Sequence, residues 1–88
     1  MSPVIHGTVR GPDGSPIPQA RAYFVSGPES FPDIAALTDA VGRFTLSAPS
    51  PGAYTMECAA EGFGPHAVSL DLEGDEERRV EITLQPEP

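Results

Sequence analysis

Proline and glycine interrupt this chain so often that helices of ordinary length have little room. Eleven prolines and nine glycines are spread over 88 residues and divide the sequence into short segments. Within these segments apolar residues alternate with polar ones, as in Tyr54, Met56 and Cys58. Alternation with a period of two is typical of strands that have one face in a core and the other in solvent. The sequence therefore predicts strands rather than helices.

The alternating segments and the turn residues between them predict an all-β, seven-stranded antiparallel Greek-key sandwich. The third strand is ambiguous, because "PDIAALTDA" also fits the start of a short helix with Asp33 as its N-cap. We interpret residues 1–88 as one domain with its core at about 4–84, and residues 85–88 as a tail or the start of a linker. The expected strands lie near 4–10, 19–26, 34–38, 43–48, 53–60, 66–72 and 78–84.

The stretch "TDAVGRF" at 38–44 predicts a turn. The acid at its first position, Asp39, can accept backbone N–H bonds, and Gly42 at the fourth position can take a positive φ. This pattern is typical of a type I turn with a G1 bulge at the tip of a hairpin. We therefore expect Asp39 to be structural rather than catalytic. Thr38 and Arg43 are expected to face solvent or to pair across the strands.

Two further turns follow the same chemistry. "GPDG" at 11–14 places proline at the second position, where its fixed φ suits the turn. "SPGA" at 50–53 predicts a type II turn with Gly52 at the position of positive φ.

The chain is acidic, which limits its partners. Thirteen Asp and Glu residues against five arginines give a net charge of −8, and the arginines are not clustered on one segment. The negative electrostatic potential that results makes nucleic acid and anionic membranes poor partners and favours a partner with a basic or neutral surface. The arginines are Arg10, Arg21, Arg43, Arg78 and Arg79.

The sequence leaves the compartment open. No apolar run approaches the roughly 18 residues that a membrane span needs, so membrane insertion is not expected. The start "MSPVIHGTVR" lacks the basic region and apolar block of a signal peptide. We expect a cytoplasmic protein if Met1 is the native start, and an extracytoplasmic or cell-envelope domain if the chain is part of a longer protein.

Four pieces of the sequence resemble the carboxypeptidase regulatory-like domain: "VIHGTVRGPDGSPIPQARAYF", "TDAVGRFTL", "SPGAYTMECAAEGF" and "VEITLQP". The resemblance runs from about Val4 to Leu84. It implies a transthyretin-like, or prealbumin-like, seven-stranded sandwich. It also implies a non-catalytic accessory module that supports, spaces or docks neighbouring domains, often in exported or cell-envelope proteins. Where members of the family carry a glycine before Ala20, this chain has Gln19.

Catalytic residues and cofactors are not expected. His6 and His66 have no neighbours in the sequence that suggest a base, a nucleophile and an orienting group, and no Gly-x-Ser-x-Gly motif occurs. Hydroxyisourate hydrolases look similar in architecture, but they depend on a Tyr-Arg-Gly-Ser ending, and this chain ends "LQPEP". Cys58 falls on the core-facing register, where burial should raise the pKa of its thiol.

The acidic segment "DLEGDEERR" at 71–79 is the one candidate for a cation-binding site. Its carboxylates suit calcium in chemical type, but their order is not that of an EF-hand loop. A solvated turn between strands explains the segment equally well. Calcium binding by residues 71–77 is therefore left open.

Two aromatic residues are candidates for a partner-binding surface. The chain has no Trp, and four of its aromatic residues are expected in the core or at its rim: Phe24, Phe44, Tyr54 and Phe63. Tyr23 and Phe31 remain, with Phe31 expected to fold over the sandwich edge rather than to be exposed. We expect a non-catalytic module that docks a neighbouring domain or partner protein. A small carbohydrate- or peptide-binding module is the alternative, because sugar rings stack on flat aromatic faces.

Overall fold

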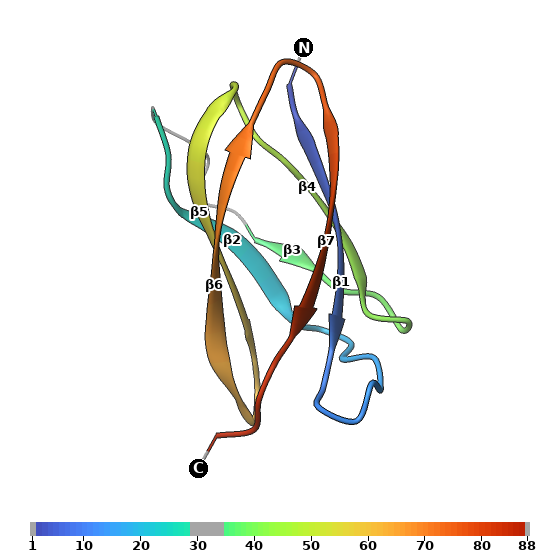
Figure 1. The fold of residues 1–88 in the computed structure, drawn as a ribbon. Coiled ribbons are helices and arrows are strands. Elements are labelled where there is room, and N and C mark those ends of the chain that lie inside the picture. Colours follow the sequence, from blue (N-terminus) through green and yellow to red (C-terminus); the bar gives the residue numbers. More distant parts are fainter. Residues whose placement is uncertain (1, 29–34, 88) are drawn as a thin grey trace.

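The computed structural model describes residues 2–28 and 35–87 (Figure 1). These residues form seven strands in two sheets and no helix, and so none that is long and apolar enough to cross a membrane. The all-β prediction is confirmed, although the third strand has only two residues. The alternative helix with Asp33 as its N-cap lies outside the described residues. The strands are β1 (Val4–Arg10), β2 (Arg21–Ser26), β3 (Ala36–Leu37), β4 (Arg43–Ser47), β5 (Gly52–Ala60), β6 (Phe63–Leu72) and β7 (Glu77–Thr83).

The strands form a three-stranded and a four-stranded sheet. The first has the order β4-β1-β7 and the second the order β3-β2-β5-β6. Four ladders are antiparallel, as predicted, but β1 and β7 run parallel, with Val4 opposite Glu77 and Val9 opposite Ile82. Parallel pairing needs a long connection, and these two strands are the first and last of the seven. The prediction of antiparallel pairing is therefore wrong for this one pair, while the Greek-key connection stays a prediction.

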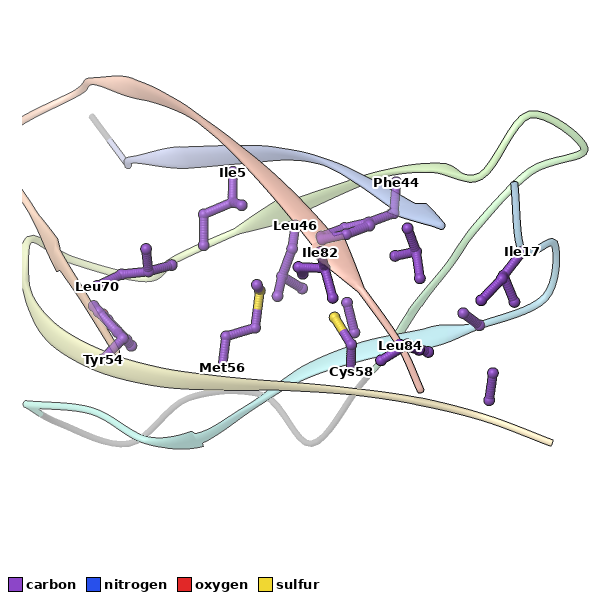
Figure 2. Packing of buried hydrophobic residues seen from close by; sticks show 14 of the residues in the cluster. Ile5, Ile17, Phe44, Leu46, Tyr54, Met56, Cys58, Leu70, Ile82 and Leu84 are labelled. Carbon is purple, nitrogen blue, oxygen red and sulfur yellow. The ribbon is translucent and has the colours of Figure 1, made fainter. Parts of the chain in front are cut away.

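Apolar residues from both sheets form the core. Figure 2 shows their side chains meeting between the layers, with Met56 and Cys58 of β5 pointing into this space. Each large side chain that leaves water in this way contributes about 1.5–3 kcal/mol. Three residues with the inward alternation, Phe24, Val68 and Val80, are only partly buried against the core. The buried hydrophobic residues are Ile5, Val9, Ile17, Ala20, Ala22, Phe44, Leu46, Ala48, Tyr54, Met56, Cys58, Ala60, Leu70, Leu72, Ile82 and Leu84.

The predicted turn between β3 and β4 is present. Gly42 has a φ of 82°, and its N–H donates to the carbonyl of Asp39 at 3.0 Å. The carboxylate of Asp39 accepts bonds from the N–H groups of Val41 and Arg43. The strands on either side of the turn lie in different sheets, however, because β3 pairs with β2 and β4 pairs with β1. The interpretation as a hairpin tip is therefore wrong, and the turn carries the chain from one sheet to the other.

Thr38 was predicted to face solvent or to pair across the strands, and the first alternative is wrong because Thr38 is buried. Its backbone pairs with Gln19 and Ala20. Its side chain is 5% exposed, and its hydroxyl donates to the carbonyl of Ile17 at 2.7 Å. The same hydroxyl accepts a bond from the N–H of Ala20 at 2.8 Å. Thr38 thereby ties the segment before β2 to the end of β3. Arg43, by contrast, is exposed as expected.

The other two predicted turns have different outcomes. At the first, Gly14 has a φ of 85° and its N–H donates to the carbonyl of Gly11 at 3.0 Å, as the prediction requires. At the second, Gly52 has the predicted positive φ, but its value of 143° is far from the roughly 80° of a type II turn. The type II geometry is therefore wrong. Instead, the hydroxyl of Tyr54 donates to the carbonyl of Ser50 at 2.7 Å and closes the loop.

Gln19 has a φ of 60°, the one positive φ of a non-glycine residue in the described part of the chain. Its N–H donates to the carbonyl of Thr38 at 3.1 Å, and the next residue, Ala20, is fully buried. The left-handed conformation costs an L-residue about 1–2 kcal/mol, whereas glycine adopts it without strain. The glycine that the resemblance implies at this position would thus have a physical reason.

Residues 85–87 lie against the turn between β5 and β6. The N–H of Gly64 donates to the carbonyl of Gln85 at 2.8 Å, and the N–H of Glu87 donates to the carbonyl of Gly62 at 3.1 Å. Phe63 and Pro86 face each other in a short antiparallel bridge. The segment expected to be a tail or the start of a linker is therefore paired with the start of β6 as far as Glu87.

Candidate functional site

The outer surface of the four-stranded sheet holds Tyr23, the candidate that the structure describes. Ala22 and Cys58 of this sheet are buried in the core, so their neighbours along each strand point outward. We call this surface the Tyr23 face. It consists of Arg21, Tyr23, Leu37, Thr55, Glu57, Ala59, Ala67 and Ser69.

A hydrogen bond holds the Tyr23 ring on this face. Tyr23 lies directly opposite Glu57 of β5, and its hydroxyl donates to Oε1 of that carboxylate at 2.6 Å. The hydrogen bond to Glu57, followed by partial burial, raises the pKa of Tyr23. The phenol therefore stays a neutral donor, and the ring has a fixed position before any partner arrives.

Leu37 adds an exposed apolar side chain to the Tyr23 face. It lies opposite Arg21, two residues before Tyr23, and is 62% exposed. Farther across the sheet, Ala59 and Ala67 point the same way with short side chains. The sequence did not single out Leu37, because an outward position on β3 follows only from the register with β2.

A shallow hollow of about 540 Å³ lies beside Tyr23. Phe63 and Pro65 supply apolar surface there, next to Ala59 of the sheet. The charged residues that line it are one arginine and three glutamates: Arg21, Glu57, Glu61 and Glu87. The hollow can therefore accept an apolar side chain that carries or adjoins a basic group.

Phe31, the second aromatic candidate, lies outside the described residues. Its expected fold over the sandwich edge, and a face shared with Tyr23, therefore stay predictions. The four aromatic residues assigned to the core or its rim, Phe24, Phe44, Tyr54 and Phe63, are all confirmed there. The rings of Phe24 and Tyr54 pack with centroids 4.6 Å apart.

The potential catalytic side chains lie apart from one another. His6 is on β1 of the three-stranded sheet, with its Nε2 2.7 Å from Oε1 of Glu77, whereas His66 is an exposed residue of β6 in the other sheet. Cys58 is buried, and burial, followed by the charge of Glu57, raises the pKa of its thiol to about 12. This confirms the prediction of a core cysteine with a raised pKa.

The acidic segment forms the turn between β6 and β7. One carboxylate, Glu76, accepts a bond from the N–H of Glu73 at 2.7 Å and pairs with Arg78 at 3.1 Å. The bond from Glu73, and then the contact with Arg78, lower the pKa of Glu76. Glu76 therefore has a structural role in closing the turn. Within residues 2–28 and 35–87, no group of three or more His, Cys, Asp or Glu residues is arranged to hold a metal ion.

Solved structures with the same fold include proteins of several kinds. The major pilin subunit BcpA of Bacillus cereus superposes with a TM-score of 0.80 at 13% identity, over 99% of this chain and 30% of that one. A type II cohesin–X-dockerin complex from Acetivibrio cellulolyticus matches with a TM-score of 0.73 at 14% identity, over 94% of this chain and 57% of that one. The 3-chlorocatechol 1,2-dioxygenase of Rhodococcus opacus matches with a TM-score of 0.69 at 17% identity, over 97% of this chain and 60% of that one. In each case the chain spans less than two thirds of the other protein.

Family membership rests on the sequence itself. No curated protein matches the chain. The carboxypeptidase regulatory-like domain matches residues 4–85, which is nearly the whole chain and all seven strands. The pilin and cohesin–dockerin structures are consistent with the prealbumin-like sandwich that the resemblance implies. The chain therefore belongs to the carboxypeptidase regulatory-like domain family.

Proposed function

We propose that this domain is a non-catalytic interaction module that docks a neighbouring domain or a partner protein through the Tyr23 face. The observation that carries the proposal is the position of Tyr23, held by Glu57 beside the exposed Leu37. Tyrosine is enriched among the residues that dominate binding energy in interfaces. A ring that is already fixed loses little conformational entropy when a partner covers it.

The shape of the face suits a protein partner. The alanines and short polar residues of this face project little above the sheet, so the backbone or side chains of a partner can approach it closely. The glutamates around the hollow favour a partner with basic groups next to apolar ones.

The comparisons support an interaction role more than a catalytic one. One similar structure is a cohesin–X-dockerin complex and another is a pilin subunit, both named for assemblies of proteins. A dioxygenase has the same fold, so the fold alone leaves catalysis open. The chemistry supports the non-catalytic reading, because the two histidines lie in different sheets and the Cys58 thiol is buried.

Affinity capture from an extract of the source cells tests the proposal. The tagged domain is compared with Tyr23→Ala and Leu37→Asp, and the captured proteins are quantified by mass spectrometry. We expect a protein that the wild type retains and that both variants lose by about tenfold or more. Val41→Asp is the matched control, because Val41 is 55% exposed but lies in the turn that joins the two sheets and is not part of the Tyr23 face.

Three results would contradict the proposal. The first is a captured protein that both variants retain as well as the wild type does. The second is binding to a member of a glycan panel that is lost with Tyr23→Ala, which would favour the carbohydrate-binding alternative. The third is turnover of a substrate that depends on His6 or His66.

A further inference from the structure

The outer surface of the three-stranded sheet has a charge unlike that of the whole chain. The arginines are scattered in the sequence, but the fold brings Arg10, Arg43 and Arg79 to this one surface, together with Glu77 and Glu81. Three arginines against two glutamates leave one positive charge, whereas the whole chain carries −8. We call this surface the basic face. Its outward-facing residues are Val4, His6, Thr8, Arg10, Arg43, Thr45, Ser47, Glu77, Arg79, Glu81 and Thr83.

Both glutamates of the basic face already have cationic or imidazole partners. Oε1 of Glu77 lies 2.7 Å from Nε2 of His6, and Glu81 accepts a bond from Arg10 at 2.9 Å.

Two guanidinium groups of this face are left without a carboxylate partner among the described residues. Arg43 and Arg79 make no side-chain hydrogen bond or ion pair with any residue of 2–28 or 35–87. Arg43 does lie near enough to Asp39 to contribute to the lowered pKa of that carboxyl. Both arginines are exposed, so both are accessible to an anionic group from outside.

The register places the two arginines on either side of β1. Arg43 lies opposite Thr8, and Arg79 lies opposite His6. Two strand spacings and an offset of two residues put their Cα atoms about 12 Å apart. A hollow of about 540 Å³ lies between them. Its lining includes the short side chains of Thr8 and Thr45 and the carboxylates of Glu77 and Glu81, which pair with His6 and Arg10.

We propose that the basic face binds a carboxylate-rich, extended segment of a partner protein, with Arg43 and Arg79 each receiving a carboxylate. A guanidinium matches a carboxylate with two parallel hydrogen bonds, which makes arginine the side chain best suited to this contact. In an extended chain, acids two to four residues apart are separated by about 7–13 Å, which matches the spacing of the arginines. The hydroxyls of Thr8 and Thr45 can donate to the backbone carbonyls of such a segment.

The charge of the rest of the domain favours a short acidic segment over a longer polyanion. At physiological salt the Debye length is about 8 Å, so a segment confined to the basic face is largely screened from distant acids. A nucleic acid extends beyond this face and meets the acidic surface around it. This proposal does not depend on the Tyr23 face, which lies on the other sheet and favours a partner with basic groups.

An NMR titration tests the proposal. The probe is a blocked peptide of alternating glutamate and serine, added to the ¹⁵N-labelled domain, and the control peptide has glutamine in place of glutamate. We expect shift changes on β1, β4 and β7 with the glutamate peptide only, and weaker binding as salt rises from about 0.05 to 0.3 M.

Three single variants locate the contact. Arg43→Gln or Arg79→Gln should weaken the binding by about tenfold, because each removes a charge-assisted contact. Arg21→Gln is the matched control, because it removes the same charge from an exposed arginine of the other sheet. It should change the affinity by less than about twofold. The amide spectrum of each variant shows directly whether it is folded.

Several outcomes would overturn the proposal. They are shift changes that occur on the four-stranded sheet instead, a glutamine peptide that binds as well as the glutamate peptide, and an Arg21→Gln variant that loses as much affinity as the other two. Inorganic phosphate that displaces the peptide at equal concentration would indicate a general anion site. A short oligonucleotide that binds more tightly than the peptide would indicate a nucleic-acid site.

Discussion

Replacing Gly42 with alanine should destabilise the domain far more than the same change at Gly14. Both glycines have a similar positive φ, 82° and 85°, so both alanines carry the same backbone strain. They differ in what the new Cβ atom meets. At Gly42 it would lie 2.5 Å from the carbonyl oxygen of Val9 and 3.2 Å from Cβ of Pro16, whereas at Gly14 nothing lies within 4 Å.

The size of the difference follows from the bonds near Gly42. The left-handed strain costs about 1–2 kcal/mol, and the stiffer unfolded chain of the alanine variant returns about 0.4–1 kcal/mol. Gly14→Ala should therefore cost about 1 kcal/mol. At Gly42 the backbone must also move away from Val9, whose N–H donates to the Gly42 carbonyl at 2.7 Å and whose carbonyl accepts from Ile17 at 3.0 Å. Losing one or both of these bonds brings the cost of Gly42→Ala to about 3 kcal/mol.

Thermal and urea unfolding followed by circular dichroism measure both variants. In a domain of this size, 1 kcal/mol corresponds to about 4–8 °C in Tm. We expect a fall of about 4–8 °C for Gly14→Ala and about 12–24 °C for Gly42→Ala. Equal shifts for the two variants would refute the argument, because they would mean that the contact of Gly42 with Val9 does not constrain the turn.

The remaining predictions concern the same region of the fold and can be measured in the same unfolding assays. Thr38→Val should cost about 1–3 kcal/mol by leaving two backbone groups without partners, whereas Thr45→Val on the exposed side of β4 should cost less than about 0.5 kcal/mol; similar losses would contradict the role of the Thr38 hydroxyl. Gln19→Gly should stabilise the domain by about 0.5–1 kcal/mol through relief of the positive φ, and a loss of stability would show that the side chain of Gln19 contributes more than the strain costs. The bond from the N–H of Arg43, followed by the bond from Val41 and the charge of Arg43, lowers the pKa of Asp39 in the folded state. The ionised carboxylate of Asp39 therefore stabilises the fold above its unfolded pKa, and this stabilisation is lost as the pH falls through the folded pKa. The stability advantage of the wild type over Asp39→Asn should therefore shrink as the pH falls below about 5 and through the folded pKa, and an advantage independent of pH would count against this linkage.

The strands could be predicted because their cause is local. Period-two alternation along a segment such as 53–60 depends only on neighbouring residues, and the structure buries Tyr54, Met56 and Cys58 accordingly. Pairing between distant segments has no such local signal. The parallel pair of β1 and β7, and the separation of β3 and β4 into different sheets, depend on the packing of the whole chain. Thr38 was misassigned for the same reason, because its hydroxyl contacts Ile17, which is remote in sequence.

The candidate surfaces show the same division. Tyr23 could be identified by elimination, because the other described aromatic residues had a place in the core or at its rim. Leu37 and Glu57 could not, since only the strand register brings them to the face of Tyr23. Likewise Arg43 and Arg79 appear scattered in the sequence and meet on one surface only because β1 lies between β4 and β7.

Site-specific photocrosslinking tests most directly whether the Tyr23 face docks a protein. A photoreactive amino acid is placed at Leu37 or Ala67, on opposite edges of this face, and at Val41 as a control in the turn before β4. With the captured partner, or with the neighbouring domain in the full-length protein, we expect crosslinks from positions 37 and 67 and none from position 41. Crosslinks from position 41 alone would contradict the account, because the partner would then bind elsewhere on the domain.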